Sequence, residues 1–411
     1  MIATQDRLNG KIRVSLDAGA VPSQPTGAGR YVLSIANALS CRDDVDLVLL
    51  CRKGDSKRWE EIAPGAAVKE VFPRARPVRL AWEQIRLGRM LATLDVDVHH
   101  GPHYTMPSQA TVPVVVTVHD LTFVENPQWH QPMKVAFFRR AIERAVRDAA
   151  SIVCVSDRTA SNLKEHFSVK CPVVVAPHGI DGSIFTPREP GAGYDDEVLR
   201  ELGISRSYIL FLGTLEPRKS VPVLVRAFDT VSRKYPDLDL VIAGRTGWDR
   251  NAVMGSLGSS VDPSRIKLTG YVSDGQLPAI LRKASLCAYP ALEEGFGLPA
   301  LEALACGTPL VTTSKVPAAE LAGGAAWIVD GESGGDMSQA EYASRLASTI
   351  CSVLGDDGER ESRRRIGLDS AQGWTWQRSA GKHMEAYRLA LEAAGGASGN
   401  ATSRHRRDQH G

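Results

Sequence analysis

Short apolar segments alternate with helical patterns along both halves of the chain. The apolar segments have the length of strands and lie at residues 12–16, 45–50, 96–100, 114–118, 151–155, 173–176, 208–212, 240–243, 266–269, 286–289, 310–312 and 327–329. Helical patterns lie at residues 30–39, 133–149, 157–166, 221–234, 342–354 and 376–394, with Ser156 and Ser220 as expected N-caps. Near-continuous apolar strands that alternate with helices are typical of a parallel sheet covered on both faces. The pattern therefore predicts an α/β fold.

A polar segment at residues 186–206, with prolines and glycines early on, separates the two halves. We interpret it as a domain connection. The expected organisation is an N-terminal Rossmann-like domain at 1–187, a C-terminal Rossmann-like domain at 188–372 and a final helix at 373–394. The tail at 395–411 has no apolar residues able to fold it and is expected to be disordered.

Composition excludes several classes of protein. A formal net charge of +2 over 411 residues gives no global bias toward nucleic acid. No apolar run approaches the ~20 residues of a membrane span, and the polar N-terminus does not resemble a signal peptide. Seven scattered cysteines without a CxxC pair favour reduced thiols and a cytoplasmic location. The sequence does not indicate an oligomeric state.

The segment LEEGFGLPALEALACGTPLVTT, residues 292–313, combines carboxylates, a glycine loop and a helix. Glu294 precedes the loop Gly295-Phe296-Gly297-Leu298, where glycine permits close approach of the backbone to a ligand. Pro299 suits a first helical turn, and Gly307 suits the position after the helix. Amides at such a helix start can bind an anion. In the alternative reading, Glu302 merely complements the helix dipole.

Two cations follow the strand predicted at 208–212. Arg218 and Lys219 end the loop that begins at Gly213, where the carboxyl end of a strand meets a helix start. Ligands of open α/β sheets bind at that edge, and adjacent cations suit a diphosphate. A solvated charge pair is the alternative. Arg245 follows the strand at 240–243 and is a further candidate for nucleotide contact.

The first half carries weaker candidates. His119 and Asp120 end the strand at 114–118, and His103 and Tyr104 follow the preceding strand, so they could line an acceptor site. A loop with Gly27 and Gly29 follows the first strand, but the third glycine of a dinucleotide fingerprint is missing. Three Asp-x-Asp pairs lie at the amino ends of strands, away from the expected ligand edge. No metal site is therefore predicted.

The string GFGLPALEALACGTP, with glutamates at 294 and 302, resembles the signature of retaining family 4 glycosyltransferases of the GT-B fold. The string LGTLEPRK at 212–219 resembles that family's phosphate-binding loop. The resemblance implies two Rossmann-like domains facing each other across a cleft, with a last helix crossing back onto the first domain. It implies no cofactor beyond the nucleotide-sugar donor.

The resemblance also assigns roles to individual residues. It implies that Glu302 holds the ribose, Glu294 the transferred sugar, and Arg218 with Lys219 the diphosphate. It places His119 against the donor sugar and phosphate, the backbone at Tyr271 and Val272 against the base, and the Gly27–Gly29 loop over the donor and acceptor sites. Gly213, Arg245, Gly295, Phe296, Gly297 and Leu298 complete the expected donor site. Catalysis is expected from His119, Arg218, Lys219 and Glu294.

The strings TVHDLTF at 117–123, PQWHQP at 127–132 and LGTLEPRK resemble the branch of O-antigen mannosyltransferases that use GDP-mannose. The expected function is metal-independent transfer of a hexose, with mannose favoured, to a glycan or glycolipid acceptor. Alternatives are a UDP- or ADP-sugar donor, a GT-B sugar-nucleotide epimerase, a phosphorolytic enzyme and a non-catalytic nucleotide-sugar sensor. Arginines interleaved with apolar residues at 73–89 suggest a peripheral membrane contact, with a packed helix as the alternative.

Overall fold

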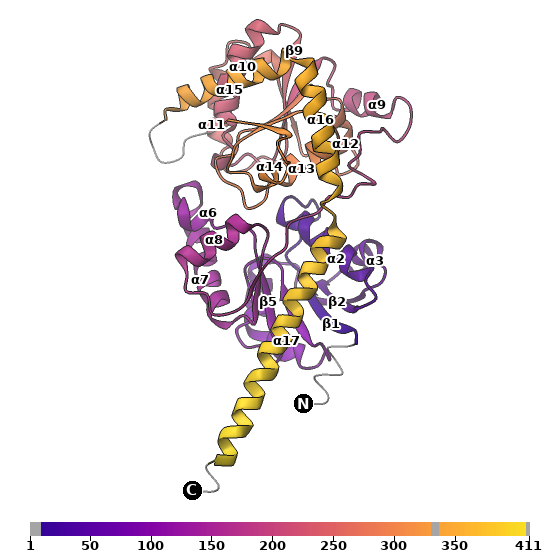
Figure 1. The fold of residues 1–411 in the computed structure, drawn as a ribbon, viewed down its shortest axis with the longest axis vertical. Coiled ribbons are helices and arrows are strands. Elements are labelled where there is room, and N and C mark those ends of the chain that lie inside the picture. Colours follow the sequence, from indigo (N-terminus) through magenta and orange to yellow (C-terminus); the bar gives the residue numbers. More distant parts are fainter. Residues whose placement is uncertain (1–9, 330–336, 408–411) are drawn as a thin grey trace. The chain divides into compact units, whose positions relative to one another are not determined.

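The computed structural model describes residues 10–329 and 337–407 and divides the chain into two units (Figure 1). The N-terminal unit contains Met1–Gly179 and Trp376–Gly411, and the C-terminal unit contains Ile180–Thr375. The sequence prediction placed these boundaries at 187 and 372. They move because Ile180 forms a parallel bridge with Thr375 and its amide donates to the Trp374 carbonyl at 2.8 Å.

The N-terminal unit contains a seven-stranded parallel sheet in the order β3-β2-β1-β4-β5-β6-β7. The strands are β1 (Ile12–Asp17), β2 (Val45–Arg52), β3 (Ala67–Phe72), β4 (Val98–Gly101), β5 (Val114–Val118), β6 (Ser151–Cys154) and β7 (Val173–Val175). The sequence prediction missed β3. Most of its side chains are exposed or half-buried, so it lacks the continuous apolar run of the central strands.

Helices complete the N-terminal unit. They are α2 (Ala28–Ser40), α3 (Ser56–Ile62), α4 (Arg76–Trp82), α5 (Gly88–Leu91), α6 (Thr122–Glu125), α7 (Pro132–Asp148), α8 (Asp157–His166) and α17 (Trp376–Arg407), with a π-helical turn η1 (Glu83–Leu87) and a 3₁₀ turn η2 (Pro127–Trp129). Ser156 caps α8 as predicted, because its hydroxyl accepts the Thr159 amide at 3.1 Å. Helix α17 continues to Arg407, where the sequence predicted a disordered tail from residue 395, and residues 408–411 lie outside the described part.

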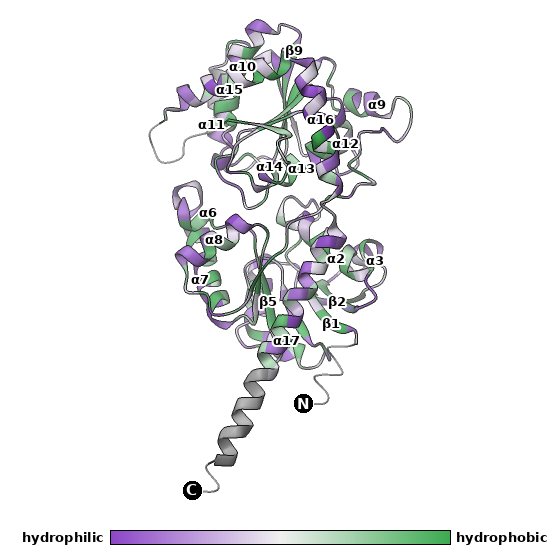
Figure 2. Ribbon diagram, in the orientation of Figure 1, coloured by the Kyte–Doolittle hydropathy of each residue, from purple (hydrophilic) through white to green (hydrophobic). Residues whose placement is uncertain are grey.

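The C-terminal unit contains a six-stranded parallel sheet in the order β10-β9-β8-β11-β12-β13. The strands are β8 (Ser207–Leu212), β9 (Leu238–Ala243), β10 (Ile266–Gly270), β11 (Leu286–Tyr289), β12 (Leu310–Thr312) and β13 (Ala326–Ile328). The strands of both sheets, such as β5 and β9, are mostly hydrophobic (Figure 2). The α/β prediction is confirmed in each unit.

The helices of the C-terminal unit are α9 (Tyr194–Glu201), α10 (Val221–Lys234), α11 (Arg250–Gly258), α12 (Leu277–Arg282), α13 (Leu298–Ala305), α14 (Pro317–Glu320), α15 (Gln339–Leu354) and α16 (Asp357–Gln372), with 3₁₀ turns η3 (Pro217–Lys219) and η4 (Pro263–Arg265). Helix α9 occupies part of the predicted connection, since Asp195 is buried and forms a bidentate ion pair with Arg282 at 2.7 and 2.6 Å. Ser220 precedes α10 but does not cap it with its side chain, because its backbone is left-handed with φ 53°.

Helix α17 contacts α2 and the strands from β4 to β7, and it carries polar groups into the core of the N-terminal unit. Five completely buried side chains form one chain of hydrogen bonds: Tyr387 to His100 at 2.9 Å, His100 to Thr117 at 2.7 Å, Thr117 to Tyr31 at 2.9 Å and Tyr31 to His383 at 2.7 Å. We call this set the polar relay.

Hydrogen positions in the polar relay follow from its last member. His383 Nδ1 lies 2.7 Å from the Ser379 carbonyl, so Nδ1 carries the proton and Nε2 of the neutral ring accepts from Tyr31. Thr117 must then donate to Tyr31 and accept from His100 Nε2, and Tyr387 donates to His100 Nδ1. Every bond is satisfied when both histidines are neutral. Burial lowers the pKa of His383 to about 4 and that of His100 well below its usual value.

The order of strands reverses direction once in each sheet, between β1 and β4 and between β8 and β11. The loops that leave the carboxyl ends of these neighbouring strands run to opposite faces, and this opens a space where ligands of open α/β sheets bind. Among the described helices, none has an apolar stretch long enough to cross a membrane.

Candidate functional site

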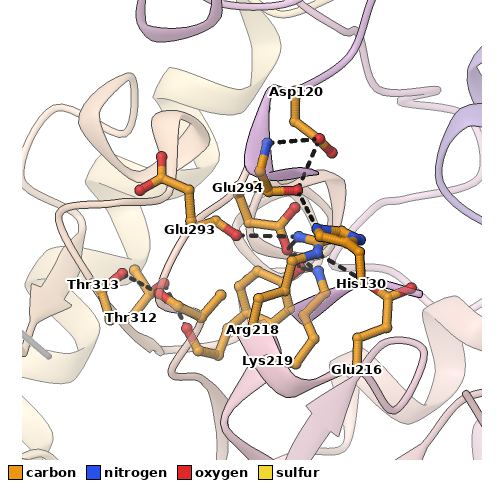
Figure 3. Close-up of polar contacts among 12 residues, drawn as sticks. Asp120, His130, Glu216, Arg218, Lys219, Glu293, Glu294, Thr312 and Thr313 are labelled. Atoms are coloured by element: carbon orange, nitrogen blue, oxygen red, sulfur yellow. Dashed lines mark hydrogen bonds and ion pairs between the residues drawn. The ribbon is translucent and has the colours of Figure 1, made fainter. Parts of the chain in front are cut away.

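Arg218 and Lys219 converge on Glu294 in the C-terminal unit (Figure 3). The cations follow β8 and the carboxylate follows β11, the two strands on either side of the reversal in strand order. Arg218 Nη1 lies 2.7 Å from Glu294 Oε1, and Lys219 Nζ donates to the same oxygen. Tyr289, the last residue of β11, also donates to Oε1 at 2.7 Å and receives a hydrogen bond from Lys219.

All of these contacts use Oε1 of Glu294. Within the described residues, Glu294 Oε2 has no hydrogen bond or ion pair, although the residue is only 8% exposed. Oε2 is also absent from the enclosed polar atoms that lack a partner, so solvent reaches it. One carboxylate oxygen is therefore fixed by the protein, and the other remains able to accept a hydrogen bond from a ligand.

The electrostatic balance of this cluster is close to neutral. Arg218 also pairs with Glu216 at 2.9 Å, so two carboxylates face the two cations. Arg218 Nη1 additionally donates to the Glu293 carbonyl at 3.1 Å, which ties the β8 loop to the β11 loop. Cations held in place by such contacts can bind an anion without reorganising when it arrives.

The loop that carries Glu294 is fixed by the segment after β12. The Glu294 amide donates to the Lys315 carbonyl at 3.2 Å, and the Ala318 amide donates to the Phe296 carbonyl at 2.8 Å. Gly297 has φ 96°, and a Cβ there would lie 2.4 Å from Val316 Cγ1. Glycine at 297 is thus required both by conformation and by space.

Helix α13 begins at Leu298, and Gly307 follows its end with φ 74°, as the sequence predicted. Glu302 lies in this helix and is 1% exposed. Cys287 of β11 is near enough that the charge of Glu302 adds to the dominant effect of burial, and the two raise the pKa of that thiol to about 12. The structure thus places Glu302 against the strand that leads to Glu294.

The remaining predicted donor residues lie at the same carboxyl edge of the C-terminal sheet. Gly213 follows β8, Arg245 follows β9, and Tyr271 with Val272 follows β10. The backbones here are close together, since a Cβ on Gly244 would lie 2.0 Å from the Gly213 carbonyl oxygen. The Arg245 carbonyl accepts the Leu215 amide at 3.1 Å and so connects the loops after β8 and β9.

The predicted residues of the N-terminal unit also gather at a carboxyl edge, after β4 and β5. The rings of His103 and Tyr104 lie 5.6 and 5.7 Å from that of His119. His119 Nε2 donates to the Pro102 carbonyl at 2.8 Å, and the Asp120 amide donates to Tyr104 Oη at 3.0 Å. Burial lowers the pKa of His119 and, with the charge of His119, lowers that of His103 to about 3. Both histidines are therefore neutral at physiological pH.

The glycine loop lies at the carboxyl edge of the same sheet, after β1. Gly27 has φ 43° and precedes α2, and a Cβ on Gly29 would lie 3.0 Å from Pro25 Cβ.

Sequence reasoning missed several residues at these edges. Tyr289 was read only as the end of a strand, although an aromatic hydroxyl at the carboxyl end of β11 is a usable signal. Asp17, the last residue of β1, was not singled out. Arg79 was read within the basic stretch at 73–89, for which both a membrane contact and a packed helix were considered. The packed alternative holds for Arg79, which is 8% exposed and lies 3.3 Å from buried Glu83.

The part of the chain at 10–329 and 337–407 contains no group of three or more histidine, cysteine, aspartate or glutamate residues placed to hold a metal ion. Metal independence stays a prediction.

Comparisons with known proteins match both units. The family described as "Glycosyltransferase Family 4" matches residues 25–184, and "Glycosyl transferases group 1" matches residues 195–366. O-antigen chain mannosyltransferase B of Escherichia coli is 26% identical over 388 residues, which cover 89% of this chain and 96% of that protein. D-inositol 3-phosphate glycosyltransferase of Paenarthrobacter aurescens is 27% identical over 414 residues, which cover 90% of this chain and 96% of that protein.

Solved structures show the same fold. Sucrose-phosphate synthase from Thermosynechococcus elongatus has a TM-score of 0.74 at 18% identity and covers 93% of this chain and 100% of its own. Anabaena HepE in complex with UDP-glucose has a TM-score of 0.67 at 17% identity and covers 94% and 100%.

Two Rossmann-like units with this likeness define the GT-B class of fold. The two family matches cover most of both units. The chain belongs to the family 4 glycosyltransferases, and within them it resembles the O-antigen mannosyltransferases.

Proposed function

We propose that the protein is a retaining hexosyltransferase that moves mannose from GDP-mannose to a saccharide or lipid-linked saccharide acceptor. The main observation in support is the cluster of Arg218, Lys219 and Glu294 at the reversal in strand order, in which Glu294 Oε2 is accessible to a ligand. Cations suit the diphosphate, and a carboxylate suits sugar hydroxyls. The match to an O-antigen mannosyltransferase along 89% of the chain supports mannose as the transferred sugar.

The roles of the residues follow from their chemistry. Arg218 and Lys219 neutralise the charge that develops on the departing diphosphate. The departing phosphate oxygen then accepts the proton of the acceptor hydroxyl on the same face of the sugar, so no protein nucleophile is required. Glu294 holds the transferred sugar and Glu302 the ribose. Neutral His119 donates from Nε2 to the Pro102 carbonyl, so its Nδ1 can accept a hydrogen bond from a sugar hydroxyl.

A UDP-sugar is the second candidate for the donor. Anabaena HepE has been crystallised with UDP-glucose, and it shares the fold at 17% identity. The backbone after β10, at Tyr271 and Val272, is expected to meet the base, and backbone contacts carry no side-chain signature for guanine or uracil. Donor choice therefore requires measurement.

GDP and GDP-mannose are expected to raise the melting temperature more than UDP, ADP or their sugars. A ligand at ~100 times its dissociation constant stabilises the folded state by about 2.7 kcal/mol. A thermal-shift panel of nucleotides and nucleotide sugars measures this, with product analysis on a labelled donor. A shift with UDP-sugars alone would refute the mannosyl assignment and leave the glycosyltransferase assignment intact.

Turnover is expected to persist in excess EDTA. The physical reason is that Arg218 and Lys219 supply the positive charge that a divalent ion would otherwise bring to the diphosphate. Transfer rates with and without EDTA check this. Complete loss of activity that returns with added magnesium or manganese would contradict metal independence.

A further inference from the structure

A second set of buried charges lies in the N-terminal unit, outside the residues discussed so far as a donor site. Asp17 ends β1, while Arg79 in α4 and Glu83 in η1 lie one helical turn apart. Their exposed fractions are 6%, 8% and 1%. We call these three residues the acidic-arginine cluster.

The cluster lies at the ligand edge of its sheet. Asp17 is at the carboxyl end of β1, next to the reversal in strand order between β1 and β4. Glu83 forms a hydrogen bond with the side chain of Thr105, the residue that follows Tyr104. The cluster therefore adjoins the group of His103, Tyr104 and His119.

The protein uses little of the hydrogen-bonding capacity of Arg79 and Asp17. Arg79 has five N–H donors, and among the described residues its side chain makes one hydrogen bond, to Glu83 at 3.3 Å. Asp17 Oδ1 accepts the Gly19 amide at 2.7 Å, while Oδ2 has no partner among the described residues. Neither Asp17 Oδ2 nor the other Arg79 nitrogens are fully enclosed, so solvent reaches these atoms. Burying charged groups without partners is costly unless a ligand supplies them.

The backbone around the cluster is built to hold it. Glu83 begins a π-helical turn, an irregularity often found at functional sites. Gly88 follows that turn, and a Cβ there would lie 1.4 Å from the Gln109 carbonyl oxygen, so the helix rests directly on the 105–110 loop. Gln84 Nε2 donates to the Met106 carbonyl at 2.9 Å. Tyr104, immediately before this loop, has a left-handed backbone with φ 63°.

The charge of the cluster restricts the ligand. Two carboxylates face one guanidinium, so the positive charge of Arg79 is already balanced, and an anionic group such as a phosphate would find no net positive charge to bind. Burial raises the pKa of both Asp17 and Glu83, which lets the pair retain a proton near neutral pH. The cluster then offers both donors and acceptors, which match the hydroxyl groups of an uncharged sugar.

We propose that Asp17, Arg79 and Glu83 form an acceptor subsite that binds hydroxyl groups of an uncharged sugar ring and disfavours a phosphorylated one. This inference rests on the proposed transfer function and adds the residues and the charge preference of its acceptor. The alternative is that the three charged residues have a purely structural role and only stabilise the packing of η1 against β1.

The test uses the full chain with GDP bound and two kinds of probe. Saturation-transfer NMR measures binding of the uncharged methyl glycosides of mannose, glucose, galactose and N-acetylglucosamine, and of anionic mannose 6-phosphate. At least one methyl glycoside is expected to bind more tightly than mannose 6-phosphate. Tighter binding of mannose 6-phosphate, or binding of no methyl glycoside, would overturn the proposal.

Asp17→Asn and Arg79→Gln are each expected to lower the affinity for the methyl glycoside about tenfold or more, because each removes a charge-assisted hydrogen bond. Each should also raise the KM of that glycoside as acceptor. The affinity for GDP is expected to change less than twofold. Arg139→Gln is the matched control, since Arg139 forms an i,i+4 pair with Glu143 at 3.4 Å on an exposed face of the same unit.

Asp17→Asn preserves the shape of the side chain and the hydrogen bond from the Gly19 amide. This variant alone can therefore test the proposal if Arg79→Gln fails to fold. Lower thermal stability with unchanged glycoside affinity would show a purely structural cluster and overturn the proposal. Turnover of the nucleotide-sugar donor in the same samples distinguishes failure of the proposed transfer function from failure of the proposed acceptor subsite. Glycoside binding through Asp17 without turnover of any nucleotide sugar would refute only the proposed function, and turnover with an unaltered acceptor KM would refute only the subsite.

Discussion

Replacing Glu294 with glutamine is expected to lower kcat/KM for the nucleotide sugar by about 100-fold or more. Glutamine keeps the shape but removes the charge that fixes Lys219, Arg218 and Tyr289 around Oε1. It also weakens the contact from Oε2 to the transferred sugar, which matters most as charge develops at the anomeric carbon. The affinity for the free nucleoside diphosphate should stay nearly unchanged, because the cations remain. Steady-state rates and calorimetry with the free nucleotide measure both.

Glu302→Gln is the informative partner of this change. It should weaken free nucleotide and nucleotide sugar alike, because Glu302 is assigned to the ribose. Asp195→Asn is the matched control, since Asp195 forms an equally buried ion pair with Arg282 in the same unit. It should lower stability by about 3 kcal/mol and leave kcat/KM unchanged. Equal loss of nucleotide affinity in both glutamate variants would contradict the division of roles, and no effect in either would refute the site.

The N-terminal unit is expected to lose several kcal/mol of stability between pH 7 and pH 5.5, while the C-terminal unit loses little. Burial lowers the pKa of His99 to about 3 and that of His383 to about 4, and it lowers those of His100 and His178 well below the usual 6.5. The unfolded chain therefore binds more protons than the folded unit below pH 6.5. The free energy of unfolding therefore decreases as the pH is lowered through that window, by roughly 1 kcal/mol per histidine per pH unit.

Two features sharpen this pH experiment. The raised pKa values of Asp17 and Glu83 act in the opposite sense and offset part of this loss. Residues 180–375 contain no histidine, so the C-terminal unit is an internal control. Hydrogen exchange compared between β5 and β8 at pH 7.5, 6.5 and 5.5 separates the units. His383→Gln should reduce the slope in β5. Equal destabilisation of β5 and β8 would contradict the buried-histidine explanation.

The sequence predicted the strands well where both faces of the sheet are covered. Central strands such as β5 and β11 are continuous apolar runs, and their bounds were predicted as observed. Strand β3 at the edge of its sheet was missed because exposure breaks up its apolar pattern. Helix α16 was missed because it is laced with charged residues and buries only Gly367 and Ala371. The pattern of apolar residues along a sequence reflects which side chains are buried. Helices and strands that bury few side chains are therefore difficult to predict from that pattern.

The proposed donor-site residues were predicted from loops at strand ends, and the structure brings Arg218, Lys219 and Glu294 together. Tyr289 and the acidic-arginine cluster were missed for a different reason. Asp17 and Arg79 are 62 positions apart, and only the packing of η1 and α4 near β1 gives them a shared environment. A pairing of this kind has no local periodicity, so a single sequence does not reveal it.

The polar relay also constrains the order in which the protein can fold during synthesis. His383 and Tyr387 are supplied by α17, which leaves the ribosome after the whole C-terminal unit. Until then Tyr31 lacks His383 and His100 lacks Tyr387, and the nascent N-terminal half holds an incomplete core. The C-terminal unit, Ile180–Thr375, is a continuous segment and has no such dependence. The unit translated second is therefore the first that can complete its fold, and the first-translated unit completes its core only after α17 has been synthesised.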